Sequence, residues 1–229
     1  MHDYVKKEVY DMIKETTLAT VDELITRYPA LSVCREDLVA AVRLLCDGYH
    51  GGHKLIVCGN GGSASDSEHI VGELMKGFLL PRKLGPEMAN RMHEVCPEEA
   101  EYFLENLQGA LPALSLVNQV ALNTAFANDQ APDLSFAQQL LGMGNEGDVL
   151  LAISTSGNST NVIYALQMAK VKGVKTIALT GKSGGKIHSR GLADVTIRVP
   201  DDETFRIQEY HLPVYHMLCI AAENEFFGE

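Results

Sequence analysis

From residue 54 onward, five short apolar runs alternate with stretches of helical periodicity. The runs are LIVCG (55–59), ALSLV (113–117), VLLAIS (149–154), KTIALTG (175–181) and DVTIRV (194–199). Runs of this length and composition are typical of strands that are buried on both faces. The helical stretches lie at 64–77, 118–127, 159–172 and 205–227. The alternation predicts one α/β domain with a doubly wound, mostly parallel sheet of about five strands.

Two amphipathic helices are predicted ahead of the first strand. Apolar residues recur mostly at three- or four-residue spacing over residues 3–28 and again over 36–50. This spacing gives each helix one apolar face. Each of these faces needs another surface to cover it.

Residues 79–112 interrupt the alternation. The segment holds Pro81, Pro86, Pro97 and Pro112, with a helix-like piece between them. A long segment of this kind is an insertion, an active-site lid or a surface excursion with no catalytic role. The sequence leaves these alternatives open.

Composition and charge exclude several classes of protein. With 229 residues, 46% of them apolar and 21% charged, the chain is long enough for one sizeable core and does not resemble a disordered protein. No apolar run approaches the roughly 18–20 residues that span a bilayer. The formal charge of −11, without a long basic run, argues against binding to nucleic acid or to an anionic membrane.

The cysteines and the amino terminus indicate in which cellular compartment the protein is expected. The five cysteines are scattered and include no Cys-x-x-Cys pair, which argues against a disulfide framework and against a cysteine-rich zinc module. The amino terminus is polar and lacks the apolar core of a secretory signal. We therefore expect a cytoplasmic protein.

A glycine-rich turn follows the first predicted strand. Gly59, Gly61 and Gly62 allow a tight turn and the close approach of a ligand. The helix that follows presents free N–H groups and the positive end of its dipole, so the turn is expected to bind an anion. Gly59, Gly61 and Ala64 also match a dinucleotide fingerprint, but no acidic residue ends a second strand about 20 residues later.

A second turn, Ser154-Thr155-Ser156-Gly157-Asn158-Ser159-Thr160, lies where the third predicted strand meets a helix. Its five hydroxyls and the N–H groups of the helix start can donate to a phosphate. N-capping by one serine or threonine is the simpler alternative, and it leaves the other hydroxyls unexplained. Neither turn has the Gly-Lys-Ser/Thr ending of a P-loop, and Gly181-Lys182-Ser183 has Thr176 in place of the first glycine.

Two further groups of polar residues lie on predicted helices. His69 and Glu73 are one turn apart and can bind a divalent metal or divide proton transfers, with a surface ion pair or a core histidine as the alternative. The last helix carries Gln208 and His216, which differ by about 80° around the helix and about 12 Å along it. Pro213 lies between them and removes a backbone donor, so we expect this helix to be disturbed.

Several segments together resemble the sugar isomerase (SIS) domain family, and within it the sedoheptulose 7-phosphate isomerases. The segments are GNGGSASDSEHIVGEL (59–74), AND (127–129), GDVLLAISTSGNSTNVI (147–163), ALTGKSGG (178–185), ADVTIRVP (193–200) and RIQEYHLPVYH (206–216). The resemblance covers most of residues 1–78 and 113–229. Residues 79–112 look longer than the corresponding family segment, which predicts an insertion there.

The resemblance implies a fold and an assembly. The fold is a single SIS domain over 1–229, a flavodoxin-like, three-layer α-β-α arrangement. The helices within 1–50 are implied in oligomer contacts, and the protein is implied to be a homotetramer with active sites between subunits. A second chain could then bring Gln208 or His216 to the face that carries His69 and Glu73.

The resemblance also implies a reaction and assigns roles. The reaction is the isomerisation of sedoheptulose 7-phosphate to D-glycero-D-manno-heptose 7-phosphate through an enediol, with Glu73 as the base and His216 as the acid. One zinc ion per subunit is implied on His69, Glu73, Gln208 and His216. The residues implied in substrate and phosphate binding are Asn60, Gly61, Gly62, Ser63, Asp129, Ser154, Thr155, Ser156, Ser159 and Gln208.

Two other functions suit the same loops. One is that of another ketose-phosphate isomerase, and the other is that of a non-catalytic SIS protein that only binds a phosphosugar. The presence of both Glu73 and His216 argues against the non-catalytic alternative. Family members commonly have Asp where Phe205 and Ser183 stand, which leaves the choice of sugar open.

Overall fold

The computed structural model describes residues 13–228. All five predicted strands are present, and they form one sheet. Their bounds are Leu55–Cys58 (β1), Ala113–Ser115 (β2), Val149–Ile153 (β3), Lys175–Thr180 (β4) and Val195–Arg198 (β5). The predicted α/β class is confirmed.

The sheet is parallel throughout and has the order β2-β1-β3-β4-β5. Leu55 of β1 pairs with Ala113 on one side and with Val149 on the other. Because the strands run in the same direction, the loops that follow β1 and β3 leave the same edge of the sheet. The order of the strands reverses between β1 and β3, and doubly wound sheets bind their ligands at such a reversal.

The strands are buried on both faces because their side chains alternate between two apolar clusters. Val57 and Leu151 belong to the cluster on one face, and Ile56 and Leu150 belong to the cluster on the other. The continuous apolar runs in the sequence are therefore what a sheet covered on both sides requires. This arrangement gives the three layers that the resemblance implies.

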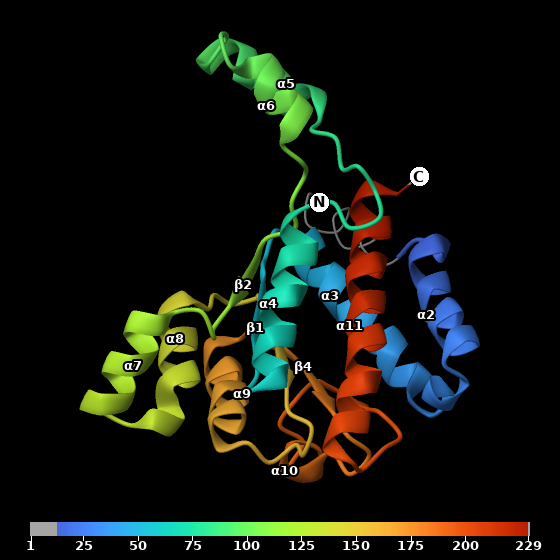
Figure 1. Ribbon diagram of the computed structural model, residues 1–229, viewed down its shortest axis with the longest axis vertical. Helices are drawn as coiled ribbons and strands as arrows, with labels where there is room; N and C mark the ends of the chain where they lie inside the picture. Colours follow the sequence, from blue (N-terminus) through green and yellow to red (C-terminus); the bar gives the residue numbers. More distant parts are fainter. Residues whose placement is uncertain (1–12, 229) are drawn as a thin grey trace, which may run out of the picture.

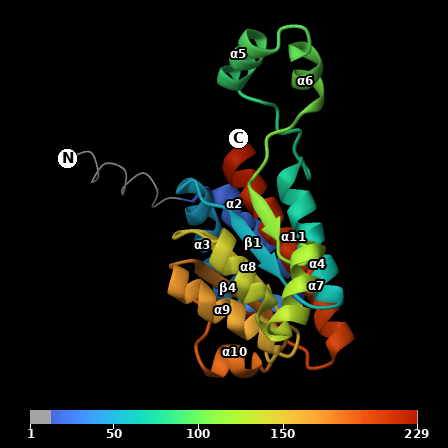
Figure 2. The ribbon, with the colours of Figure 1, turned by 90° about the vertical axis from the view of Figure 1, so that its left-hand side faces the viewer.

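Helices cover both faces of the sheet (Figures 1 and 2). They are Glu15–Arg27 (α2), Arg35–His50 (α3), Gly62–Met75 (α4), Val120–Asp129 (α7), Ser135–Met143 (α8), Thr160–Lys172 (α9), Gly185–Ser189 (α10) and Thr204–Phe227 (α11), with short 3-10 helices at Pro29–Cys34 (η1) and Pro132–Leu134 (η2). Helices α2, α3, α4 and α11 contribute to one apolar cluster, and α8, α9 and α10 contribute to the other. Across residues 13–228, no helix combines the length and the apolar character needed to cross a bilayer.

The amino-terminal helices pack onto α11. The helix predicted over 3–28 is seen as α2, and its residues 3–12 lie outside the described residues. Val21 and Leu24 of α2 are buried in the cluster that also holds α11. Part of the apolar surface of these helices is thus covered within the chain, and their role in oligomer contacts stays a prediction.

Helix α11 runs unbroken through Pro213, so the expectation of a disturbed helix is wrong. A proline inside a helix removes one backbone hydrogen bond and crowds the preceding turn. Here Pro213 is buried, and the neighbouring Val214 and Tyr215 are almost fully buried as well. This packing outweighs the local cost, and Gln208 and His216 therefore lie on one continuous helix.

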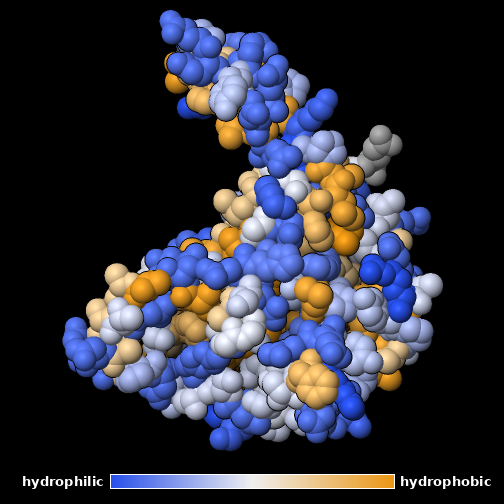
Figure 3. Space-filling view, in the orientation of Figure 1, coloured by the Kyte–Doolittle hydropathy of each residue, from blue (hydrophilic) through white to orange (hydrophobic). Residues whose placement is uncertain are grey.

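Residues 86–106 form a helical hairpin that projects from the body (Figures 1 and 2). Its helices are Pro86–Val95 (α5) and Ala100–Asn106 (α6). The space-filling view shows open space between the hairpin and the body (Figure 3). At its base, the Gly77 N–H donates to Gln108, and Gly109 lies against the ring of Phe227. These contacts are at the far ends of α4 and α11 from the loops, so the hairpin is not a lid over the loops of its own chain.

A buried ion pair joins the base of the hairpin to α11. Arg82 Nε donates to Glu223 Oε1 at 2.6 Å, and both side chains are fully buried. Glu223 also accepts hydrogen bonds from the backbone N–H groups of residues 78–80. Arg82 donates to the carbonyl oxygens of Glu73 and Leu74 at the end of α4. The pair therefore fixes the end of α4 as well as the hairpin.

We expect Glu223→Gln to lower the free energy of unfolding by about 3–5 kcal/mol, because it leaves the buried Arg82 guanidinium without a counter-charge. Urea-induced unfolding of the variant and of the unaltered protein measures the difference. The matched control, Asp22→Asn, removes the carboxylate of the exposed Asp22–Arg35 pair and should cost less than about 1 kcal/mol. An equally small loss for Glu223→Gln would contradict this account.

Candidate functional site

Two loops leave the carboxyl edge of the sheet side by side. The first, Asn60 to Ser63, follows β1 and begins α4. Gly61 has a φ of 57°, a conformation that glycine adopts without strain. A Cβ on Gly59 would lie 2.6 Å from the carbonyl oxygen of Ser63, so the turn leaves no room for a side chain at that position.

The second loop, Ser154 to Ser159, follows β3 and leads into α9. The hydroxyls of Ser154 and Ser159 are hydrogen-bonded at 3.0 Å. Gly157 has a φ of 63°, and a Cβ there would collide with the backbone of Gly184. The loop is therefore held closely against the segment that follows β4.

A pair of amides joins the two loops. Asn60 Nδ2 donates to Asn161 Oδ1 at 2.9 Å, and Asn161 Nδ2 donates back to Asn60 Oδ1 at 2.8 Å. Asn161 lies in the first turn of α9, so this contact brings the starts of α4 and α9 together. The predicted binding residues of the two loops are thus neighbours.

The loops offer hydroxyl and N–H donors at different depths. Ser63 and Ser154 are buried, Thr155 and Ser159 are half-buried, and Ser156 is exposed. No side chain caps the amino end of α4 or of α9, so N-capping does not explain the serines. Uncapped helix starts next to hydroxyls can donate several hydrogen bonds to an anion such as a phosphate.

The predicted pair of His69 and Glu73 forms on α4. His69 Nε2 lies 3.1 Å from Glu73 Oε1, and Lys76 Nζ donates to Glu73 Oε2 at 2.8 Å. Partial burial raises the pKa of the Glu73 carboxyl, but the hydrogen bonds and charges of Lys76 and His69 outweigh it, so this pKa lies below its usual value. Glu73 is therefore ionised at neutral pH. The sequence analysis missed Lys76, although its i, i+3 spacing from Glu73 pointed to it.

Helix α11 lies beside α4 and runs in the same direction (Figure 1). The ring of His216 is edge-on to that of His69, with the centroids 5.1 Å apart. The hydroxyl of Tyr215, which the sequence analysis also missed, lies 3.0 Å from His69 Nδ1. The packing of α4 on α11 brings His216 to this face within one chain, so a second chain is not needed for that residue, and the contribution of a second chain through Gln208 stays a prediction.

His216 has an unpartnered nitrogen in this setting. Its Nε2 atom is buried and makes no hydrogen bond. Burial, together with the nearby His69, lowers the pKa of His216 below its usual value, so the ring is neutral at neutral pH. An orphaned imidazole nitrogen next to a histidine–glutamate pair is a donor set that suits zinc.

The arrangement is not a formed metal cage. Within residues 13–228, no group of three His, Cys, Asp or Glu side chains is set to hold a metal ion as it stands. His69 contacts both Glu73, at 3.1 Å, and the ring of His216, with centroids 5.1 Å apart. Zinc at this position therefore stays a prediction.

Gln208 lies near the first loop. A Cβ on Gly62 would lie 2.7 Å from Gln208 Nε2, so the two residues are in close contact. Gln208 and His216 are separated by about 12 Å of rise along α11. Within one chain this position suits the predicted contact of Gln208 with substrate, and its role as a metal ligand stays a prediction.

Asp129 lies apart from the other predicted site residues. It is exposed at the end of α7, where its carboxylate accepts a hydrogen bond from Asn128. In Figure 1, α9 and α4 lie between α7 and α11. Its predicted contact with substrate therefore has no support from the contacts of a single chain.

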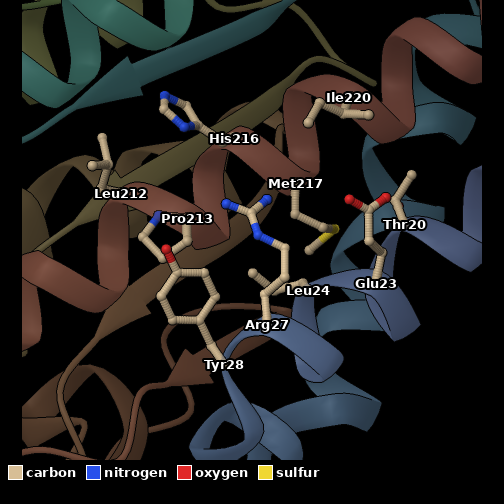
Figure 4. Close-up of a pocket in the computed structure, with 10 residues that line it drawn as sticks. All are labelled: Thr20, Glu23, Leu24, Arg27, Tyr28, Leu212, Pro213, His216, Met217 and Ile220. Carbon is tan, nitrogen blue, oxygen red and sulfur yellow. The ribbon is translucent and has the colours of Figure 1, made fainter.

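His216 also borders a small cavity between α2 and α11 (Figure 4). The cavity measures about 180 Å³, and Glu23, Arg27 and Met217 are among the residues that line it. Ligand pockets usually measure about 300–1,000 Å³. This cavity alone is therefore too small to enclose a sugar phosphate.

Comparisons with known proteins agree with this arrangement. A family described as SIS domain matches residues 101–181. A phosphoheptose isomerase from Akkermansia muciniphila is 35% identical over 201 residues, which cover 88% of this chain and 92% of the relative. Another, from Citrifermentans bemidjiense, is 40% identical over 188 residues, which cover 82% of this chain and 83% of the relative.

Solved structures are similar over nearly the same extent. The phosphoheptose isomerase from Neisseria gonorrhoeae has a TM-score of 0.68 and 31% identity, covering 93% of this chain and 100% of that one. The enzyme from Francisella tularensis has a TM-score of 0.69 and 30% identity, covering 86% of this chain and 91% of that one. With similarity of this extent in both sequence and fold, the chain belongs to the phosphoheptose isomerase family.

Proposed function

We propose that this chain interconverts sedoheptulose 7-phosphate and D-glycero-D-manno-heptose 7-phosphate. Its relatives at 35% and 40% identity are phosphoheptose isomerases. The observation that carries the proposal is the contact of the His69–Glu73 pair on α4 with His216 on α11, two helices whose amino ends lie at the donor-rich loops. Such a site can hold an anionic group at one end and move protons at the other.

In this proposal, the loops hold the phosphate. Ser154, Thr155, Ser156 and Ser159 would donate from the second loop, and the first loop would assist through Asn60 and Ser63. The N–H groups at the starts of α4 and α9 add the positive ends of two helix dipoles. The loops carry no lysine or arginine, so hydrogen bonds rather than charge would bind the phosphate.

The length of α4 between the loop and the histidine favours a long sugar. Gly62 and His69 are separated by a rise of about 10 Å along the helix. An extended seven-carbon sugar phosphate also spans about 10 Å from C1 to phosphorus, since three chain bonds span about 3.5 Å. A five-carbon sugar phosphate is about 2 Å shorter by the same measure. A heptose phosphate therefore fits this length, and the choice of a heptose over a shorter sugar rests on the relatives.

Isomerisation requires a proton to move between C1 and C2 while the carbonyl oxygen becomes an alcohol oxygen. The Glu73 carboxylate, held by Lys76 and His69, is ionised at neutral pH and can take the carbon-bound proton and return it to the neighbouring carbon. His216, the assigned acid, has a ring that is neutral at neutral pH, so it would take the proton that the C1 hydroxyl loses and give a proton to the oxygen at C2. Together these roles describe an enediol mechanism, in which Glu73 moves the proton between the two carbons and His216 serves their oxygens.

Zinc fits the proposal as a resident ion. His69, Glu73 and His216 would hold it. The predicted fourth ligand, Gln208, would have to come from a neighbouring subunit, because within one chain it lies at Gly62. When bound, the ion would act as a Lewis acid that stabilises the negative charge developing on the substrate oxygen. The residues themselves would position the sugar and carry its protons.

A homotetramer with sites between subunits remains part of the proposal. The cavity at His216 is too small for the substrate, and α7, the helix that ends at Asp129, is separated from α11 by α9 and α4 (Figure 1). Both observations would be explained if a neighbouring subunit completed the site. The cytoplasmic location expected from the sequence likewise stays a prediction.

We expect the purified protein to convert sedoheptulose 7-phosphate and to act weakly on five- and six-carbon ketose phosphates, because these fall short of the His69 turn. Product formation and exchange of the substrate proton with deuterated water measure this across the panel. Turnover of a hexulose phosphate alone would assign another ketose-phosphate isomerase. Binding without turnover of any sugar would assign a non-catalytic phosphosugar-binding protein.

We expect Glu73→Gln to lower kcat by about 10²–10⁴-fold, because the amide cannot take the proton. Binding of the sugar phosphate, followed by calorimetry, should change little, since the loops are untouched. The control is Glu68→Gln, the same change at an exposed position of the same helix, which should keep full activity. Equal activity of Glu73→Gln and the unaltered enzyme would refute the assigned base.

We expect chelation to remove about one zinc ion per subunit and most of the activity, because the ion stabilises the developing charge. Metal analysis before and after chelation, with activity followed in parallel, measures both. Added zinc should restore the rate. Full activity in demonstrably metal-free enzyme would take zinc out of the mechanism.

A further inference from the structure

A chain of hydrogen bonds joins α4 to α11 behind the His69–Glu73 pair. The Tyr215 hydroxyl donates to Asp66 Oδ1 at 3.3 Å and lies 3.0 Å from His69 Nδ1. His69 Nε2 in turn lies 3.1 Å from Glu73 Oε1. The order along the chain is therefore Asp66, Tyr215, His69 and Glu73, with a carboxylate at each end.

The groups at the two ends of this chain are carboxylates, which can only accept. The Tyr215 hydroxyl hydrogen therefore points to Asp66, and the phenol oxygen is left free to accept a hydrogen from His69 Nδ1. Glu73 likewise accepts from His69 Nε2 when a hydrogen lies between them. A metal ion bound by His69 and Glu73 would take the place of that hydrogen.

Ring packing holds the imidazole in the same orientation. The rings of His69, Tyr215 and His216 meet edge-on, with centroid separations of 5.6 Å for His69 and Tyr215, 5.1 Å for His69 and His216, and 4.9 Å for Tyr215 and His216. Tyr215 is 1% exposed, whereas the His69 side chain is 43% exposed. The buried tyrosine is thus the fixed member of the cluster, and the histidine is the member that would otherwise rotate in solvent.

We propose that Tyr215 is a positioning residue that orients His69 so that, when a cation is bound, Nδ1–H lies on the phenol and the Nε2 lone pair is aimed, beside Glu73, at the shared cation position. The inference rests on the zinc site of the proposed function and assigns a residue outside its ligand set. A lone pair and a carboxylate oxygen directed at one point repel each other unless a proton or a metal ion lies between them. Second partners of this kind orient metal-binding histidines and raise their basicity.

The alternative is a purely structural role, in which Tyr215 hydrogen-bonds to His69 only because a buried hydroxyl needs a partner. Asp66 alone would meet that need. The 3.0 Å contact to His69 Nδ1 is shorter than the 3.3 Å contact to Asp66, so the histidine is a full member of the chain. A purely structural tyrosine would also leave the affinity of the site for zinc unchanged, which makes the two accounts separable.

The test compares Tyr215→Phe with Tyr49→Phe in the full-length protein. Both changes remove one hydroxyl from a buried tyrosine, and the Tyr49 hydroxyl donates to the backbone carbonyl of Pro112 rather than to His69. Zinc affinity is measured by competition with a chromophoric chelator. We expect about a 10- to 100-fold loss for Tyr215→Phe and no change for Tyr49→Phe.

A second measurement follows the His69 side chain itself and involves neither metal nor activity. In the metal-free protein, the orientation of the His69 ring is followed by NMR contacts between the side chains of His69 and residue 215, and we expect Tyr215→Phe to make the ring reorient. Asp66→Asn should weaken zinc binding in the same direction but less, and it provides the test if Tyr215→Phe does not fold. Unchanged ring orientation together with unchanged zinc affinity in Tyr215→Phe, or unchanged zinc affinity in Asp66→Asn where Tyr215→Phe does not fold, would overturn the inference.

The outcomes separate this inference from the proposed function. Heptose isomerase activity of the unaltered protein, together with unchanged zinc affinity in Tyr215→Phe, overturns the role of Tyr215 alone. Loss of zinc affinity in Tyr215→Phe, in a protein that isomerises no sugar phosphate, overturns the proposed function alone. An unaltered protein that takes up no zinc at His69 overturns the inference whatever its activity.

Discussion

The parallel packing of α4 against α11 is the constraint on which the site depends. Both helices run back from the carboxyl edge of the sheet, so residues meet in the same order along each. Gly62 meets Gln208 at the loop end, and seven residues further along each helix His69 meets Tyr215. One helix pair thereby sets the distance between the anion-binding loops and the groups that can move protons.

Polar contacts tie α4 down at its start, its middle and its end. The amides of Asn60 and Asn161 hold the loop that begins it, Tyr215 reaches it from α11 near the middle, and Arg82 binds the last carbonyl oxygens. Because Arg82 is itself held by the buried carboxylate of Glu223, the end of α4 is positioned by a pair with no access to water. Glu73 therefore stands on a helix with little freedom to shift.

The strands and most of the helices could be predicted because local pattern decides them. A parallel sheet covered on both faces needs continuous apolar strands. The two turns need glycine where φ is positive or where a Cβ does not fit, and such glycines are recognisable in the sequence. Local rules failed where packing outweighed them. Pro213 did not disturb α11 because its surroundings are buried, and α8 was missed although Phe136 and Leu140 on it join the core.

The sequence by itself determined the α/β class, the sheet with its two anion-binding turns, and the residue types needed for proton transfer. Only the tertiary structure decided which of those residues meet. It brought His216 to His69 within one chain, left Gln208 at the loop end and Asp129 on another helix, and introduced Tyr215 and Lys76. The physical reason is that contacts between distant segments depend on the direction and register of helix packing, which periodicity within a helix does not encode.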